Sequence, residues 1–212
     1  MEEGITTMIE YLTQKQIDLA VEKIQNGKIL IFPTETSYGI GCDATNQSAV
    51  NKIFKIKKRD IGKPFPIIVN SIAKAREYLQ WSDLLDKIAK KYWPGALTIV
   101  AQCRSAKPKL AKGVVSEQGT VAIRVTSGKF ASQLCKMTNV PIVATSANIS
   151  GRNEIYSIQQ IKKVFSDLDF LPDAIFDAGD LPANLPSTII AVANNKVELL
   201  RQGDVIIQTK RK

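Results

Sequence analysis

The chain of 212 residues contains no histidine, so any active site must work without the commonest general base. A Ser–His–Asp triad cannot be assembled. The three cysteines, Cys42, Cys103 and Cys135, lie far apart and form no CxxC pair. The sequence therefore argues against a metal, such as zinc, held by the protein itself. Unpaired cysteines are typical of the reducing cytoplasm.

Further absences narrow the class of protein. No apolar run approaches the ~20 residues that cross a bilayer. The N-terminal stretch MEEGITTMIEYL lacks the basic start and apolar core of a signal peptide. There is no P-loop motif, no GxGxxG fingerprint and no GxSxG elbow. We therefore expect a cytoplasmic globular protein, with no membrane association and no common nucleotide-binding motif.

What the chain does have is positive charge. Lys and Arg total 29 against 20 for Asp and Glu, which gives a net charge of +9. This surplus favours anionic partners such as nucleotides, pyrophosphate or RNA, without choosing among them. Aromatic residues make up only 7 % and do not interleave with the basic stretches, which weighs against a protein that only binds RNA.

Apolar periodicity predicts alternating helices and strands. Helices are expected over residues 13–27, 46–58, 71–79, 82–93, 129–137 and 158–165. Strands are expected over residues 28–32, 65–69, 97–102, 120–125, 141–145, 174–176, 187–192 and 196–200. Short connections between alternating elements are typical of an α/β fold, and the crowded late strands favour a mixed sheet. We expect one domain over residues 1–212, with a frayed basic tail at residues 209–212.

The stretch FPTETSYG, residues 32–39, follows a short apolar strand and carries Thr34. α/β proteins commonly bind ligands where a strand ends, and the hydroxyls and backbone N–H groups there could hold an anion. The alternative is an ordinary turn whose threonines cap the next element.

The stretch KIKKRDIGKP, residues 55–64, contains a lysine that continues the inward face of its helix. Lys57 lies four residues after Ile53 and seven after Val50. With Arg59 and Lys63 it could hold a polyphosphate. The alternative is that these lysines complement the helix C-terminus.

In the stretch GTVAIRV, period-two alternation puts Thr120 and Arg124 on the same face of a strand. An arginine on an interior strand needs a bound anion or a carboxylate partner, and the sequence leaves both open.

Three other segments place hydroxyls or an arginine after strands. TSANISG contributes Ser146 and Asn148, PST contributes Ser187, and LLRQG contributes Arg201. Each alone is also explained by a capped turn. Together they suit the binding of an anionic substrate better than the formation of a covalent intermediate.

These segments resemble the YrdC-like family. PTETSYGIGCDA, KIKKRDIGKPF, YWPGALT, VAIRV, TSANISG, PSTI and LLRQG occur in that family's order and spacing, over residues 13–206. The resemblance implies a single α/β domain with a twisted open mixed sheet flanked by helices and a basic concave face. It also implies a nucleotidyltransferase that converts L-threonine, bicarbonate and ATP to threonylcarbamoyl-adenylate and pyrophosphate. Partner proteins then transfer the threonylcarbamoyl group to the adenosine beside the tRNA anticodon.

The resemblance also implies a role for each candidate residue. Threonine would be bound by Thr34, Arg124 and Ser187. The catalytic pair facing the phosphates would be Lys57 and Arg59. The other residues on the ATP side would be Lys63, Thr120, Ser146, Asn148, Glu154 and Arg201. Mg²⁺ would arrive with ATP, held mainly by the phosphates.

The implied reaction explains how the chain could work without histidine. N-carboxythreonine is already an anion at neutral pH, so its attack on the α-phosphorus needs no general base. Catalysis would rest on alignment and on cations that spread the developing phosphate charge.

The chain departs from the family pattern at three places. Asp60 stands where an Arg-Pro pair is usual, TSGK at residues 126–129 replaces the end of the common RVPxH run, and STIIA lacks a frequent aspartate. These departures bear on substrate affinity.

There are two alternatives to the function that the resemblance implies. One is a non-catalytic protein that binds double-stranded RNA, and the other is a relative that forms carbamoyl-adenylate. The sequence decides neither the oligomeric state nor direct binding of tRNA.

Overall fold

The computed structural model describes residues 9–13, 15–104, 109–166 and 168–207, so the expected basic tail at 209–212 lies outside the described residues. It confirms the mixed α/β class. The helices are α1 (Ile17–Gln25), α2 (Gln47–Lys57), α3 (Ile72–Tyr78), α4 (Asp83–Tyr92), α5 (Lys129–Thr138) and α6 (Ile158–Phe165). The strands are β1 (Glu10–Leu12), β2 (Leu30–Pro33), β3 (Tyr38–Gly41), β4 (Ile67–Val69), β5 (Leu97–Gln102), β6 (Thr120–Val125), β7 (Ile142–Val143), β8 (Thr145–Ser146), β9 (Ala174–Phe176), β10 (Thr188–Ala193) and β11 (Lys196–Arg201).

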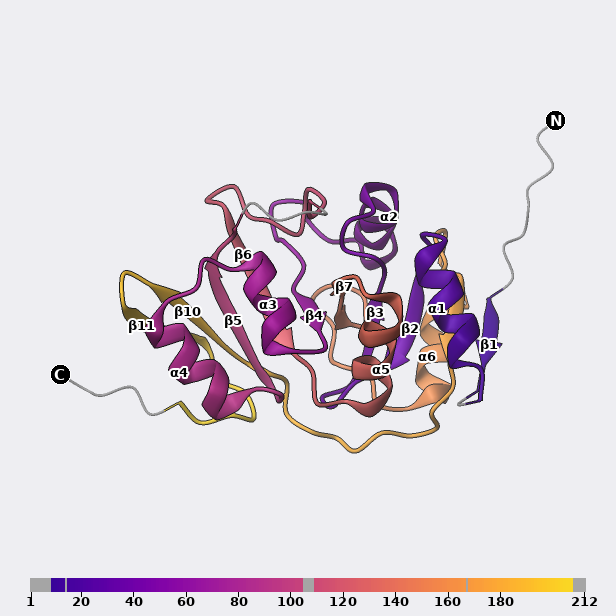
Figure 1. Cartoon of the computed structure of the whole chain (residues 1–212). Coiled ribbons are helices and arrows are strands. Elements are labelled where there is room, and N and C mark those ends of the chain that lie inside the picture. Colours follow the sequence, from indigo (N-terminus) through magenta and orange to yellow (C-terminus); the bar gives the residue numbers. More distant parts are fainter. Residues whose placement is uncertain (1–8, 14, 105–108, 167, 208–212) are drawn as a thin grey trace.

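The strands are divided between two mixed sheets. The five-stranded sheet has the order β1-β9-β2-β3-β8, and the six-stranded sheet has the order β11-β10-β5-β6-β4-β7. β2 pairs parallel with β9 and antiparallel with β3, while β5 pairs parallel with β10 and antiparallel with β6. Figure 1 shows β5, β6, β10 and β11 on the left with α3 and α4, and β1, β2 and β3 on the right with α1 and α6. The two sheets therefore lie beside each other in the structure.

Side-chain caps fix the starts of three helices. Asn46, Ser71 and Ser82 each accept a backbone N–H from the first turn of α2, α3 and α4 respectively. α1 begins at Ile17, later than its expected start at Thr13, because the Thr13 N–H and hydroxyl bond to the Gln16 side chain before the helix starts.

Two apolar clusters form the core. The larger surrounds the ring contact between Phe54 and Phe65, whose centroids lie 4.2 Å apart. The smaller lies where α1 and α5 pack against β2, and it includes Phe32 and Phe176. Burial of these rings is the main favourable term that holds the helices on the sheets.

β3 is an element that the sequence reading missed, because it treated SYGIGCDA as loop. Tyr38–Gly41 pairs antiparallel with Leu30–Pro33, so PTETSYG is the turn of a hairpin. A Cβ added at Gly41 would lie 1.9 Å from the Val143 carbonyl oxygen, so only glycine fits there. The short strand β1 was missed as well.

None of the described helices is long and apolar enough to cross a membrane.

Candidate active site

A cavity of about 270 Å³ lies where the two sheets meet, and its walls come from both. The structure brings together these predicted site residues in its lining: Thr34, Arg59, Arg124, Ser146, Glu154, Ser187 and Arg201. Four predicted residues do not line it: Lys57, Lys63, Thr120 and Asn148. The lining holds three guanidinium groups and one carboxylate, so its charge favours anions.

Thr34 lies in the turn between β2 and β3. Its hydroxyl donates to the Ser37 carbonyl oxygen at 2.8 Å and accepts the backbone N–H of Thr36 at 3.2 Å. The turn and the ligand-binding interpretations are therefore compatible, because the same threonine shapes the turn and lines the cavity.

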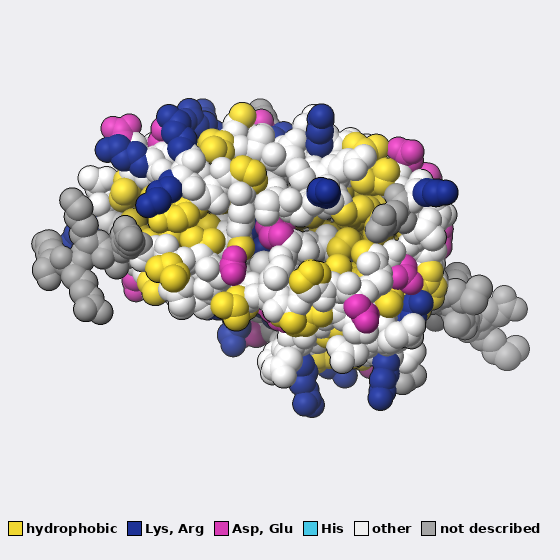
Figure 2. All heavy atoms as spheres, turned by 90° about the horizontal axis from the view of Figure 1, so that it is seen from below, with side chains coloured by type: hydrophobic (Ala, Val, Ile, Leu, Met, Phe, Trp, Pro, Cys, Tyr) yellow, Lys and Arg dark blue, Asp and Glu magenta, His cyan; other side chains and the backbone are white. Residues whose placement is uncertain are grey.

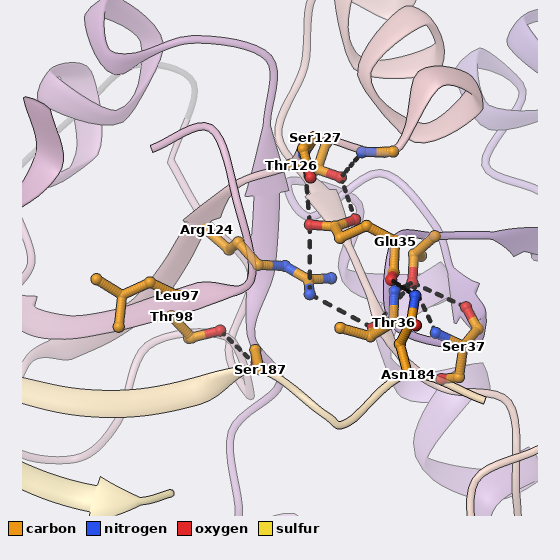
Figure 3. A network of polar contacts seen from close by, with 12 residues as sticks. Glu35, Thr36, Ser37, Leu97, Thr98, Arg124, Thr126, Ser127, Asn184 and Ser187 are labelled. Atoms are coloured by element: carbon orange, nitrogen blue, oxygen red, sulfur yellow. Dashed lines mark hydrogen bonds and ion pairs between the residues drawn. The ribbon is translucent and has the colours of Figure 1, made fainter. Parts of the chain in front are cut away.

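Arg124 points from β6 into the cavity and is 7 % exposed. One terminal nitrogen lies 3.5 Å from the Glu35 carboxylate and 3.5 Å from the Thr36 hydroxyl, as Figure 3 shows. The two alternatives for this arginine thus coexist: it has a carboxylate partner and still faces the cavity.

Glu35 is the residue that sequence reasoning missed. Its carboxylate accepts the Thr126 hydroxyl at 2.6 Å and the Ser127 N–H at 3.4 Å, besides its contact with Arg124. Two facts in the sequence could have pointed to it: an acidic residue inside the PTETSYG turn, and an interior arginine that needed a partner.

Lys57 is 1 % exposed and points inward, as its helical spacing predicts, but not into the cavity. Its ammonium donates to the carbonyl oxygens of Ser146 at 2.5 Å and Asn148 at 2.7 Å, and to the Asn148 side chain at 2.9 Å. Burial, with the nearby Arg59 charge, lowers the pKa of Lys57 to about 7. In this structure Lys57 fixes the turn that carries Ser146.

Asn148 also serves that turn. Its side-chain nitrogen donates to the carbonyl oxygens of Arg152 at 2.5 Å and Asn153 at 3.1 Å, and its side-chain oxygen accepts from Lys57 and from the Ser146 hydroxyl. Of this group, Ser146 lines the cavity, and the other two support it.

Arg59 lies in the turn that follows α2, together with exposed Lys63. Its guanidinium donates to the carbonyl oxygens of Lys63 at 2.9 Å and Pro64 at 3.2 Å and stacks 5.1 Å from the Phe65 ring. Burial lowers the pKa of Arg59. The Asp60 carboxylate accepts the Gly62 N–H at 2.9 Å within its own turn.

The far wall comes from β10, β5 and β11. The Ser187 and Thr98 hydroxyls lie 2.9 Å apart, and Arg201 donates to the Ser187 carbonyl oxygen at 2.8 Å. Burial lowers the pKa of Arg201, while the Glu154 charge raises it. Glu154 accepts the Tyr156 hydroxyl at 3.1 Å.

Thr120 lies at the start of β6, away from the cavity, and its hydroxyl pairs with that of Ser116 at 2.8 Å. No group of three Cys, Asp or Glu side chains gathers into a metal site within the described ranges. The lining can hold an anion and orient it, and it contains no thiol or imidazole to act as a nucleophile.

The chain is similar to known proteins over most of its length. A family model named for Sua5, YciO and YrdC, with the description "Telomere recombination", matches residues 22–203. Threonylcarbamoyl-AMP synthase from Pseudoalteromonas translucida is 32% identical over 188 residues, which are 87% of this chain and 97% of that protein. The protein of the same name from Bacillus subtilis is 32% identical over 90% of this chain and 54% of its own length.

Among solved structures, Pyrococcus abyssi Sua5 in complex with L-threonine has a TM-score of 0.83 and 30% identity. The match covers 93% of this chain and 58% of that one. The chain therefore spans nearly all of one relative and a little over half of the other two.

Proposed function

The chain belongs to the Sua5/YciO/YrdC family, and from this premise we propose that it is an L-threonylcarbamoyladenylate synthase. The reaction condenses L-threonine with bicarbonate and then with ATP, and it releases water and pyrophosphate. The observation that carries the proposal is the cavity lined by Arg59, Arg124 and Arg201 together with the Thr34 and Ser146 hydroxyls. Its product would serve modification of tRNA in the cytoplasm, in company with proteins that transfer the threonylcarbamoyl group.

The cavity lining offers groups for both substrates. Thr34, Arg124 and Ser187 would hold threonine, with the Arg124 guanidinium on its carboxylate. Arg59, Ser146, Glu154 and Arg201 would face ATP. Lys57 would act on ATP through Ser146, whose backbone it holds, rather than by direct contact with the phosphates.

The charge of the nucleophile determines which groups the site must supply for the reaction. The threonine amine captures bicarbonate to give a carbamate, whose oxygen attacks the α-phosphorus while pyrophosphate leaves. The carbamate is already anionic, so the absence of histidine does not impede this step. Arg59 and Arg201 would stabilise the charge that develops on the phosphates. The lining offers one carboxylate, Glu154, which suits a Mg²⁺ ion carried mainly by the phosphates of ATP.

An alternative role as a protein that only binds RNA finds less support. On the face that Figure 2 shows, Lys and Arg side chains occur at several separate places and do not form a continuous basic patch. A phosphate-reading surface for duplex RNA would need such a patch.

The test is pyrophosphate release by the full chain with ATP, Mg²⁺ and bicarbonate, with and without L-threonine, and with L-serine in its place. We expect release that requires both threonine and bicarbonate. Arg59→Ala should lower the rate by about 100-fold or more, whereas Lys91→Ala, at an exposed lysine, should not. ATP binding without threonine-dependent release would refute the proposal and favour the carbamoyl-adenylate relative.

A further inference from the structure

One carboxylate near the cavity, that of Glu35, has no role in the proposed reaction. Glu35 is not part of the described lining, and its side chain is 12% exposed. One of its carboxylate oxygens lies 3.5 Å from a terminal nitrogen of the Arg124 guanidinium, as the close-up in Figure 3 shows.

The Thr126 hydroxyl fixes the position of this carboxylate. That hydroxyl accepts the Gly128 N–H at 3.2 Å, which leaves its one proton free to donate to Glu35 at 2.6 Å. The Ser127 N–H contacts the other carboxylate oxygen at 3.4 Å. The carboxylate thus has a set orientation before any substrate arrives.

Gly128 leaves the room that this arrangement needs. A Cβ at that position would lie 3.0 Å from the Glu35 backbone nitrogen and 3.1 Å from a carboxylate oxygen. Thr126, Ser127 and Gly128 belong to the TSGK segment in which this chain departs from the common family run. The departure therefore builds a contact with Glu35.

A third element reaches the same residue. The Asn184 side chain donates to the Glu35 backbone carbonyl at 3.0 Å. Asn184 lies in the segment between β9 and β10 that runs along the bottom of Figure 1 from one sheet to the other. Glu35 is thus held by residues from two segments that are far apart in the sequence.

We propose that Glu35 is a positioning residue: its carboxylate, fixed by Thr126 and Ser127, holds the Arg124 guanidinium in the orientation that receives the carboxylate of the amino acid substrate. This inference rests on the proposed function, because it assigns Arg124 to the amino acid. A long, flexible side chain that is already ordered loses less freedom when it binds, so the substrate is bound more tightly.

Removal of Glu35 has two opposing effects. It frees positive charge on Arg124, which would attract any anion, and it releases the guanidinium from its fixed place. Replacement of Thr126 by valine separates these effects, because both charges stay and only the fixing hydroxyl is lost. If position decides, both Glu35→Ala and Thr126→Val weaken threonine binding.

The experiment is calorimetric titration of L-threonine into the full chain in the presence of ATP, with the KM values for threonine and ATP measured in parallel. We expect Thr126→Val to weaken threonine binding by about three- to tenfold and Glu35→Ala by about tenfold or more. The KM for ATP should stay within about twofold. Thr126→Ser keeps the hydroxyl and should restore the wild-type affinity.

The matched control is Thr138→Val, which removes a buried hydroxyl bonded to the Leu134 carbonyl oxygen in α5, away from the cavity. It should leave threonine binding unchanged. If the wild-type chain binds threonine and both Glu35→Ala and Thr126→Val bind it as tightly or more tightly, the positioning role is wrong and the proposed function stands. If the wild-type chain binds no threonine, the proposed function is wrong, and the inference that rests on it is wrong too.

Discussion

Lys57 and Arg124 are two buried cations beside one cavity, and they use their hydrogen-bond donors differently. Below a pH of about 7 Lys57 is an ammonium with three N–H groups, and its three acceptors all come from the turn that carries Ser146. The contacts of Arg124 within the described chain involve only one terminal nitrogen of its guanidinium. A buried cation whose donors are all used is part of the framework, whereas one with donors to spare is ready to bind an anion.

The partners of the two cations differ in charge as well. Lys57 is surrounded by neutral oxygens, and burial lowers its pKa to about 7. Arg124 has the carboxylate of Glu35 at 3.5 Å. The charge of Arg124 is thus compensated by a carboxylate, whereas Lys57 is stabilised only by the dipoles of neutral groups.

The largest expected effect is the loss of threonine binding when Arg124 is replaced. Arg124→Leu should lower kcat/KM for L-threonine by about 100-fold or more, because a charge-assisted contact to the substrate carboxylate is lost. Pyrophosphate release against threonine concentration measures it. Arg104→Leu, at an exposed arginine, is the control. A loss of less than about threefold would show that Arg124 does not bind the substrate.

The second prediction tests whether Lys57 stabilises the folded chain. Lys57→Met leaves two buried carbonyl oxygens without their donor, so we expect the free energy of unfolding to fall by about 2–4 kcal/mol and Tm to fall by roughly 5–10 °C. Urea and thermal denaturation measure both. Lys58→Met, at the exposed neighbour, should change Tm little. Equal Tm values for the two variants would contradict the assignment.

The third prediction uses the lowered pKa of Lys57. Between pH of about 7 and the ordinary value of 10.5, the unfolded chain keeps a proton that the folded chain has lost. The stability contribution of Lys57 therefore rises with pH through that window and is lost as pH falls toward 7. The difference in unfolding free energy between wild type and Lys57→Met should grow by about 1–2 kcal/mol from pH 7 to pH 9. A constant difference in urea denaturation would show that the ammonium stays charged throughout.

The smallest expected effect concerns Asn184, which bonds to Glu35 and through it supports Arg124. Asn184→Ala removes one exposed hydrogen bond to the Glu35 backbone, so the KM for threonine should rise by no more than about threefold. Asn153→Ala is the control, since its side chain makes no hydrogen bond within the part of the chain that the structure describes. A much larger change would mean that the segment between the sheets controls access to the cavity.

Much of the fold could be predicted from local signals. The starts of α3 and α4 and the alternation in β6 could be predicted because they depend on neighbours a few residues apart. β3 was missed because Gly39 and Gly41 are poor strand formers, and the need for glycine at position 41 comes from the Val143 carbonyl, which is far away in the sequence.

The site was predictable in residue type and less so in role. The inward direction of Lys57 followed from helical spacing, but its acceptors lie 89 and 91 residues further along the chain. The partner of Arg124 was equally out of reach, because Glu35 and Arg124 meet only when the two sheets come together. Periodicity tells which way a side chain points, and tertiary packing determines what it meets.

The division of the cavity between two sheets has a consequence for how the protein is made. One wall begins at Thr34, and another is completed by Ser187 and Arg201, which follow nearly all the rest in the chain. β10 then inserts beside β5, about ninety residues earlier, in a parallel pairing whose loop closure makes folding slow. A growing chain on the ribosome has no finished cavity until β10 and β11 have emerged. Substrates that bind only the finished cavity would then stabilise the completed fold over its unfinished precursors.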